Sequence, residues 1–242
     1  MNRLGRKLSR SMQRHGLIGL LGLALDHLTG FANSLRPSVR AGIRESKQRS
    51  IEFDKRFGVK TVGFMHQTEL NIKNPNQLHA VSYGGSDPKD FRDALGALPI
   101  DYRRSVFIDF GSGKGRAILL AKEFPFKRIV GVEFSEELHR IAQDNIRRYH
   151  SDISKCKDAE SICMDVVDYP LPDECLVCYF CNPFDATIMT QILSNIRKTF
   201  FQKPREIFVV YYNPKEGYLF DESDCFKIVG TIGNVRIWKT KC

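Results

Sequence analysis

Apolar and polar residues recur with two different periods over the second half of the chain. Short, mostly apolar runs typical of buried strands span residues 105–110, 128–133, 161–165, 176–181 and 206–212. Apolar residues at helical spacing occur in residues 116–123, 136–149 and 185–200. The tail predicts a closing hairpin of residues 226–232 and 234–239 around Gly233-Asn234. This alternation predicts an α/β fold, with a mostly parallel, doubly wound sheet covered by helices on both faces.

The chain before residue 100 is less regular. Charged residues from Arg44 to Arg56 predict a helix, with interruptions before it at Pro37 and Gly42. Residues 57–85 are rich in turn formers and predict irregular structure. Asp87-Pro88 predicts the start of a short helix, because Asp caps a helix well and Pro is tolerated in the first turn.

Charge divides the chain into two parts. Residues 1–49 contain ten Lys or Arg against two acids, whereas residues 50–242 contain 27 against 26. A chain of 242 residues, 42% hydrophobic and 27% charged, suits one globular domain with an extension and excludes a wholly disordered or fibrous protein. We therefore expect a basic, helical arm over residues 1–49, an irregular and helical region over 50–99, and the α/β domain over 100–242.

The arm allows several interpretations. Its cations Arg3, Lys7, Arg10 and Arg14 share one helical stripe, and the apolar run from Leu17 to Leu25 is too short to span a bilayer. A secretory signal or an organellar transit peptide would have this composition. A retained amphipathic helix would bind an anionic membrane surface or nucleic acid phosphates through residues 1–36. The remaining alternative is a solvated helix that packs on the body.

The cysteines indicate reduced thiols in the cytoplasm. They are Cys156, Cys163, Cys175, Cys178, Cys181, Cys225 and Cys242, an odd number without framework spacing. The spacing from Cys175 to Cys181 resembles a metal-binding pattern. These residues lie in a predicted strand, however, where residues three apart point to opposite faces, so we expect no metal.

The strongest candidate for a ligand-binding segment is the loop Asp109-Phe-Gly111-Ser-Gly113-Lys-Gly115. It follows a predicted strand and precedes a helix, and its glycines allow the backbone to bend and to approach a ligand closely. The dinucleotide fingerprint would need a small residue where this chain has Arg116, and no phosphate-binding loop motif is present. Glu133 ends the next strand and can accept from two ribose hydroxyls, and Asp165 ends the third.

The glycine loop, Glu133 and Asp165 together resemble the cofactor-binding motifs of class I S-adenosyl-L-methionine-dependent methyltransferases. The resemblance covers residues 100–242. It implies a Rossmann-like, seven-stranded sheet with a terminal antiparallel hairpin, and residues 50–99 as a cap over the cofactor. It further implies S-adenosyl-L-methionine binding by Asp109, Gly111, Ser112, Gly113, Gly115, Glu133, Phe134, Asp165 and Val166.

Asn182-Pro183-Phe184 follows the fourth strand and resembles the motif of amine and amide N-methyltransferases, with one proline missing. More loosely, it resembles that of non-SET lysine methyltransferases. The resemblance implies that Asn182 aligns a target nitrogen and that the Phe184 ring packs on the substrate. Thr61 and Tyr83, before the first strand, and Tyr211, at the end of the fifth, are further candidates for substrate contact.

Three functions remain open at this point. The first is an N-methyltransferase that acts on a protein side chain or another amine. The second is an RNA or other nucleic acid methyltransferase that uses the basic arm. The third is a non-catalytic module that binds the cofactor. The absence of a clear general base beside Asn182 suits an amine acceptor.

Overall fold

The computed structural model describes residues 37–63, 79 and 84–241. By its internal contacts the chain divides between Gln48 and Arg49. Helix α2 (Pro37–Phe57) begins at Pro37 and continues through Gly42. The predicted interruption at Gly42 is therefore wrong, whereas the residues before Pro37 lie outside the described part of the chain. Proline fits the first turn of a helix, where its missing N–H would have no partner, and one glycine costs a helix only about 1 kcal/mol.

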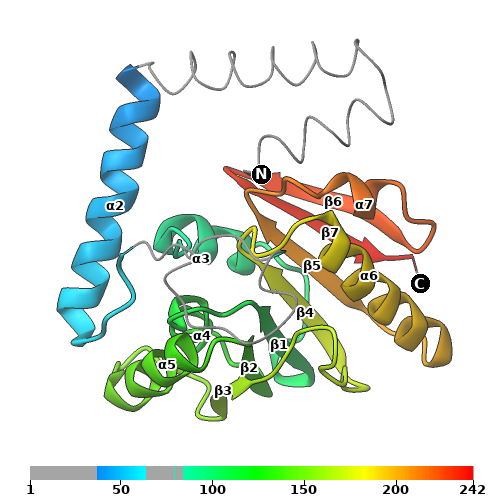
Figure 1. Cartoon of the computed structure of the whole chain (residues 1–242), viewed down its shortest axis with the longest axis horizontal. Helices are drawn as coiled ribbons and strands as arrows, with labels where there is room; N and C mark the ends of the chain where they lie inside the picture. Colours follow the sequence, from blue (N-terminus) through cyan, green and yellow to red (C-terminus); the bar gives the residue numbers. More distant parts are fainter. Residues whose placement is uncertain (1–36, 64–78, 80–83, 242) are drawn as a thin grey trace. The chain divides into compact units, whose positions relative to one another are not determined.

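The body contains a seven-stranded sheet in the order β3-β2-β1-β4-β5-β7-β6 (Figure 1). Its strands are β1 (Ser105–Phe110), β2 (Arg128–Glu133), β3 (Ala159–Cys163), β4 (Cys175–Phe180), β5 (Ile207–Tyr212), β6 (Phe226–Ile232) and β7 (Val235–Thr240). Strands β1 to β5 are parallel, and β7 runs antiparallel to both β5 and β6. The predicted α/β sheet with a terminal hairpin is confirmed.

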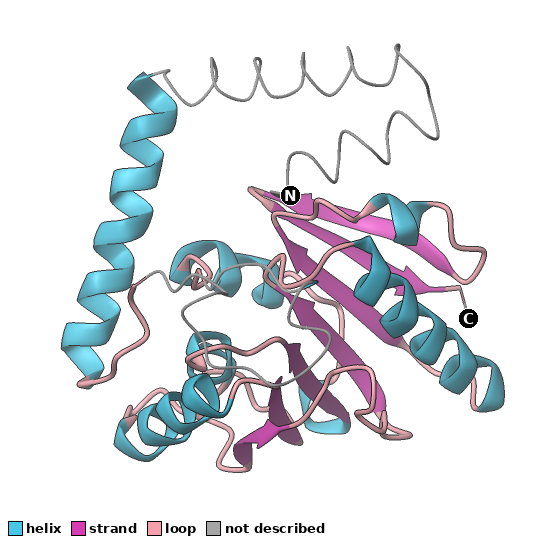
Figure 2. Ribbon diagram, in the orientation of Figure 1, coloured by secondary structure: helices cyan, strands magenta, loops and turns pink. Residues whose placement is uncertain are grey.

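Helices cover both faces of this sheet (Figure 2). One layer contains α3 (Pro88–Gly96), α4 (Arg116–Ala121) and α5 (Glu136–Arg148), and a short 3-10 helix (Tyr102–Arg104) precedes β1. The other contains α6 (Ala186–Gln202) and α7 (Tyr218–Asp221). In β1, Phe107 packs under α3 and α4, whereas Ile108 faces the α6 side. Because β1 is buried on both faces, its consecutive central residues Val106, Phe107 and Ile108 are all apolar.

Strand β3 differs from its prediction. It spans Ala159–Cys163, two residues earlier than the apolar run suggested, and it pairs with β2 from Ala159 opposite Ile129. Because β3 is an edge strand and only half-buried, its Ala-Glu-Ser start carries no strong hydrophobic signal. The residues expected to end β3 therefore lie in the loop that follows it.

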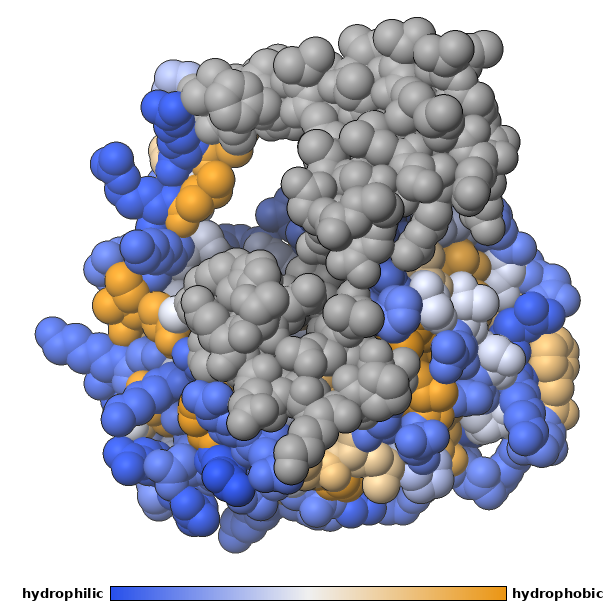
Figure 3. All heavy atoms as spheres, viewed as in Figure 1, coloured by the Kyte–Doolittle hydropathy of each residue, from blue (hydrophilic) through white to orange (hydrophobic). Residues whose placement is uncertain are grey.

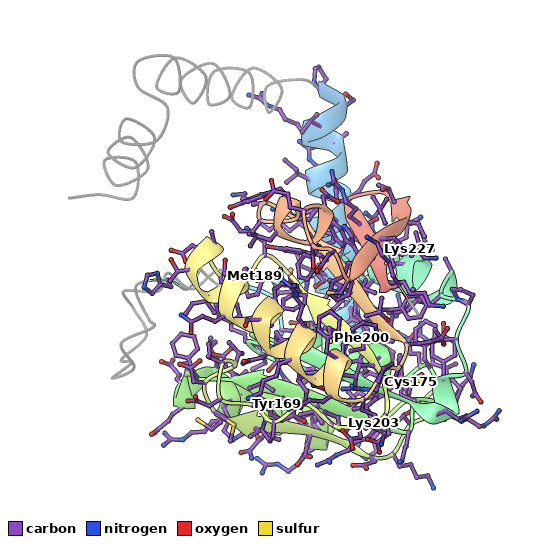
Figure 4. The ribbon with its side chains drawn as sticks, turned by 90° about the vertical axis from the view of Figure 1, so that its right-hand side faces the viewer. Tyr169, Cys175, Met189, Phe200, Lys203 and Lys227 are labelled. Carbon is purple, nitrogen blue, oxygen red and sulfur yellow. The ribbon has the colours of Figure 1, made fainter. Side chains whose placement is uncertain are left out.

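The side of the domain that carries α6 is shown in Figure 4, where Met189 and Phe200 of α6 are labelled and both are buried. The surface in Figure 3 is mainly hydrophilic outside the grey atoms, with smaller apolar areas between charged groups. Within the residues that the structure describes, no helix has the length and apolar character needed to cross a membrane.

Gly131, in the middle of β2, tests how closely α4 and its loop pack on the sheet. A Cβ atom there would lie 2.7 Å from Ser112 Cβ and would also meet Ile118 Cδ1. We expect Gly131→Ala to lower the free energy of unfolding by about 1–3 kcal/mol, as overpacking does. Urea unfolding measures this effect.

Gly230→Ala in β6 is the matched control, because a Cβ there meets nothing closer than 4.0 Å. It should leave stability unchanged or raise it slightly, since alanine loses less backbone entropy. Equal destabilisation by the two substitutions would contradict close packing at Gly131.

Candidate active site

The glycine loop leaves the carboxyl end of β1, which lies between β2 and β4 in the sheet. Gly111, Gly113 and Gly115 all adopt positive φ angles, of 78°, 55° and 82°. The backbone N–H groups of Gly111 and Ser112 both donate to the carbonyl of Val132, at 2.9 and 3.1 Å. The loop therefore turns across the end of β2 before Gly115 caps α4. Left-handed backbone at three positions explains why the loop needs glycine there.

The loop after β4 approaches the glycine loop closely. A Cβ atom added to Gly111 would lie 2.7 Å from Pro183 Cβ and 3.1 Å from Phe184 Cζ. The glycine loop and Asn182-Pro183-Phe184, about 70 residues apart in the chain, thus meet at one sheet edge. In open α/β sheets ligands bind at this edge, where strand order changes direction.

Glu133 is the buried anchor between β2 and the glycine loop, with 3% of its surface exposed. One carboxylate oxygen accepts from the N–H of Gly113 at 2.8 Å, and the other accepts from the N–H of Ser135 at 2.9 Å. Each carboxylate oxygen can accept two hydrogen bonds. The N–H of Phe134 also contributes to holding this carboxylate, which still retains acceptor capacity for a ligand.

Asp109 lies beside Glu133 and is equally buried. Burial, with a smaller contribution from the charge of Glu133, raises the pKa of Asp109 to about 8. Burial raises the pKa of Glu133 to about 7, although its backbone hydrogen bonds oppose the shift. A cation bound beside these two buried carboxyls would favour their ionised forms, so the pair provides an environment suited to a positively charged ligand group.

Asn182 follows β4 in left-handed backbone conformation, with φ of 48°, and is 8% exposed. Asparagine tolerates this conformation better than most residues, and such outliers cluster at functional sites. Among the residues that the structure describes, none forms a hydrogen bond with its side-chain amide. Its neighbour Phe184 is buried among the residues of the α6 face. The ring of Phe184 therefore packs in this apolar cluster and close to Gly111, and its predicted contact with substrate stays a prediction.

The remaining predicted cofactor residues surround this edge. Asp165 lies two residues beyond β3, and its carboxylate accepts from the N–H of Val167 at 3.0 Å. Val166 is buried and Phe134 is half-buried, both within the apolar cluster on the α6 face. The hydroxyl of Ser112 is buried, and no hydrogen-bond partner for it exists in the described part of the chain.

The three substrate candidates differ in their positions. Thr61 is fully buried, and its hydroxyl donates to Asp54 and accepts from Arg116. This hydroxyl is therefore bonded to two protein groups, and its predicted contact with a substrate stays a prediction. Tyr211 is also fully buried and packs in the core beside Phe180. Tyr83 lies outside the described residues, as does the arm over residues 1–36.

The cysteines of β4 alternate between faces, as expected for a strand. Cys178 packs in the core on the α6 face, whereas Cys181 packs on the opposite face. In the described ranges, no group of three or more His, Cys, Asp or Glu is placed to hold a metal ion. Every cysteine that the structure describes is a free thiol.

The sequence did not predict a buried polar cluster around Arg116. Arg116 appeared only as a departure from a dinucleotide motif, yet it is 4% exposed and bonds to Thr61, Ser50 and Ser86. Its partners lie 30–66 residues away in the chain. A short sequence motif cannot reveal such a cluster, because only tertiary structure brings its members together.

Residues 108–202 match the family model described as a methyltransferase domain. The match begins in β1 and includes the glycine loop, Glu133 and Asn182. Residues 108–202 are therefore similar to a methyltransferase domain. The sheet order and the terminal hairpin are those that the resemblance to class I methyltransferases implied, and S-adenosylmethionine is the cofactor that this resemblance implies.

Similar solved structures share little sequence with this methyltransferase domain. An RNA methyltransferase from Salinibacter ruber, in complex with S-adenosyl-L-homocysteine, is 16% identical, with 65% of this chain and 92% of that chain covered and a TM-score of 0.43. A ribosomal protein L11 methylase from Lactobacillus delbrueckii subsp. bulgaricus is 16% identical, with 62% and 74% covered and a TM-score of 0.40.

A predicted N6-adenine-specific DNA methylase from Listeria monocytogenes is 12% identical, with 64% of this chain and 51% of that chain covered and a TM-score of 0.48. No curated protein matches the chain. Because the similarities are low and the names of these proteins differ in acceptor, they do not identify the acceptor of this methyltransferase.

The residues at the sheet edge fit the cofactor. S-adenosylmethionine has a ribose with two hydroxyls, a sulfonium and an ammonium group. The carboxylate of Glu133 offers acceptors for hydroxyls, and the buried pair Asp109 and Glu133 favours a cation. The buried hydroxyl of Ser112 supplies a further polar group beside Gly131. We expect these residues to hold the adenosyl and methionine parts of the cofactor.

The raised pKa values predict how stability depends on pH in the cofactor-free protein. An acid whose pKa is raised by folding binds more protons in the folded than in the unfolded state between the two values. Stability should therefore fall as pH rises from about 4 to about 8, with a maximum slope of about 1.4 kcal/mol per pH unit for each group. Asp109→Asn removes one such group and should flatten this slope in denaturant titrations. Parallel pH profiles for the two proteins would contradict the burial of a titrating carboxyl at Asp109.

Proposed function

We propose that this enzyme transfers the methyl group of S-adenosylmethionine to a nitrogen of a protein side chain or of another amine. The observation that carries the proposal is Asn182. Its side chain lies at the sheet edge in left-handed backbone conformation, in a loop packed against the glycine loop. The side-chain oxygen of Asn182 can accept a hydrogen bond from an acceptor N–H.

This arrangement supports the alignment of a nitrogen. Gly111 approaches Pro183 so closely that the loop after β4 and the cofactor loop have a fixed spacing. An acceptor bonded to Asn182 is then held beside the methyl donor, with the nitrogen lone pair directed at the methyl carbon. Such alignment replaces a bimolecular encounter and accounts for much of the rate enhancement in displacement reactions.

The chemistry requires little more than alignment. S-adenosylmethionine supplies a methyl group on a sulfonium sulfur, which takes the bonding electron pair and leaves as a neutral thioether. The nitrogen forms the new N–C bond with its lone pair, and a proton passes from the nitrogen to water. A neutral amine already has this lone pair, so the chain needs no strong base beside Asn182.

We also propose a cytoplasmic location, because every described cysteine is a free thiol. Reduced thiols are typical of that compartment. The association of residues 1–36 with an anionic surface stays a proposal that rests on their charge alone.

The acceptor class is testable without knowledge of the substrate. Incubation of a cell lysate with the enzyme and methyl-labelled S-adenosylmethionine should label protein or a small amine. Acid hydrolysis of the product should release the label on a methylated nitrogen. Label on nucleic acid would assign a different acceptor class, and label on carbon or oxygen would overturn the N-methyltransferase.

Asn182 itself gives the sharper prediction. Asn182→Ala should lower turnover by about 10²-fold, since one positioning hydrogen bond is lost in a buried site. The affinity for S-adenosylmethionine should stay unchanged in calorimetry. Asn182→Asp should retain part of the activity, because a carboxylate oxygen also accepts from N–H.

Asn213→Ala is the matched control for backbone strain. Asn213 follows β5, precedes a proline and also has positive φ, of 51°, but it is exposed. It should lose stability comparable to Asn182→Ala and keep its turnover. Full activity in both Asn182 variants would contradict a role in aligning the acceptor and would leave Asn182-Pro183-Phe184 with only a structural role as a turn.

A further inference from the structure

Arg116 is the first residue of α4 and directly follows the glycine loop. Its side chain is almost completely buried, with 4% exposed. Arginine keeps its charge in proteins, and a buried guanidinium must have its N–H donors satisfied. The partners of this group therefore indicate what it holds in place.

The guanidinium of Arg116 bonds to three separate segments. Nε donates to Thr61 Oγ1 at 2.7 Å, and one terminal nitrogen donates to Ser50 Oγ at 2.8 Å and to the carbonyl of Ser86 at 3.2 Å. Ser50 belongs to the C-terminal part of α2, and Ser86 precedes α3. One side chain thus joins the cofactor loop to segments that precede the sheet in sequence.

Thr61 is fixed from its other side by Asp54. This carboxylate accepts from the Thr61 hydroxyl, from the Thr61 N–H at 2.6 Å and from the Val62 N–H at 2.7 Å. Because the hydroxyl donates to Asp54, its lone pair is directed at Arg116. The threonine therefore lies between a carboxylate and a guanidinium, in a single orientation.

A second attachment joins the same segment to the glycine loop. The side chain of Asn145 on α5 accepts from the Lys60 N–H at 2.8 Å and donates to the Lys114 carbonyl at 2.9 Å. Lys114 Nζ in turn donates to the Val62 carbonyl at 3.2 Å. Residues 60–62 are thus bonded to the cofactor loop at several points.

The polar cluster continues to the acceptor side of the site. Gly85 lies so close to Arg116 that a Cβ atom there would be 2.7 Å from the guanidinium. The Tyr179 hydroxyl donates to Ser86 Oγ at 2.6 Å, and the Cys181 thiol lies 3.4 Å from the Gly84 carbonyl. Tyr179 belongs to β4, and Cys181 directly precedes Asn182.

We propose that Arg116 is a positioning residue that fixes the glycine loop for the cofactor and sets its spacing from the end of β4. It acts through its partners Thr61, Ser50 and Ser86 and contacts neither reactant. The first half of this proposal rests on the cofactor loop. Only the second half, the spacing from Asn182, rests on the proposed N-methyltransferase. A measurement of cofactor affinity therefore tests Arg116 independently of the acceptor.

The full-length chain offers a matched control in Arg205. This arginine is 9% exposed, and it donates to the carbonyls of Pro172, Glu174, Thr199 and Lys203. It lies at the end of the domain marked by Cys175 and Lys203 in Figure 4, near the start of β4 and β5. Replacement of either arginine by lysine removes several buried hydrogen bonds and should destabilise the fold.

Calorimetric titration of S-adenosylmethionine into the folded variants distinguishes the two arginines. Arg116→Lys should weaken the affinity about ten-fold or more, because lysine cannot reach three separate partners at once. Arg205→Lys should leave the affinity within about two-fold, whatever its loss of stability in urea. Equal affinities for both variants would overturn the positioning role.

Thr61 supplies a milder test should Arg116→Lys fail to fold. Thr61→Val removes the hydroxyl between Asp54 and Arg116 and should weaken cofactor binding several-fold. Thr61→Ser retains the hydroxyl and should restore the affinity, which a role in packing alone would not predict, because serine lacks the methyl group. Failure of serine to restore binding, or no effect of valine, would overturn the proposal.

Discussion

The fold and the site depend on one buried carboxylate, that of Glu133. It accepts hydrogen bonds from the N–H of Gly113 in the glycine loop and from the N–H of Ser135 before α5. It thereby joins β2, the glycine loop and the start of α5 at the carboxyl edge of the sheet. Without these bonds, the carbonyl of Val132 would be the one remaining attachment described here between β2 and the left-handed turns at Gly111 and Gly113. The same carboxylate retains acceptor capacity toward the cofactor ribose. Structure and binding are therefore linked through one group.

Close approach of backbone segments is the second constraint. The absence of a side chain lets Gly111 lie against the loop after β4. It likewise lets α4 and its loop pack against Gly131 of the sheet, and lets the guanidinium of Arg116 lie against Gly85. At each position a side chain would occupy space that a neighbour already fills. The result is a dense edge at which Asn182 and the cofactor loop are held at fixed spacing. Displacement chemistry depends on such spacing, because it requires donor and acceptor to be aligned.

The sequence predicted the local features well and the long-range ones poorly. The buried strands β1 and β2 were located to the residue, because the central residues of a strand covered on both faces form an unbroken apolar run. The edge strand β3 was misplaced, because its polar start carries no such signal. The glycine loop follows a local rule about positive φ. The cluster around Arg116 could not be predicted, because its members are brought together only by the fold.

The most direct measurement is calorimetric titration of S-adenosylmethionine into the wild-type chain and into Glu133→Gln, with melting temperatures to establish that both are folded. Two ribose hydrogen bonds to a carboxylate are worth roughly 1.5–3 kcal/mol each, and glutamine retains only one acceptor oxygen. We predict micromolar binding by the wild-type chain and an affinity about ten-fold or more weaker in the variant. Equal affinities in the two folded proteins would contradict the assignment of this sheet edge as the cofactor site.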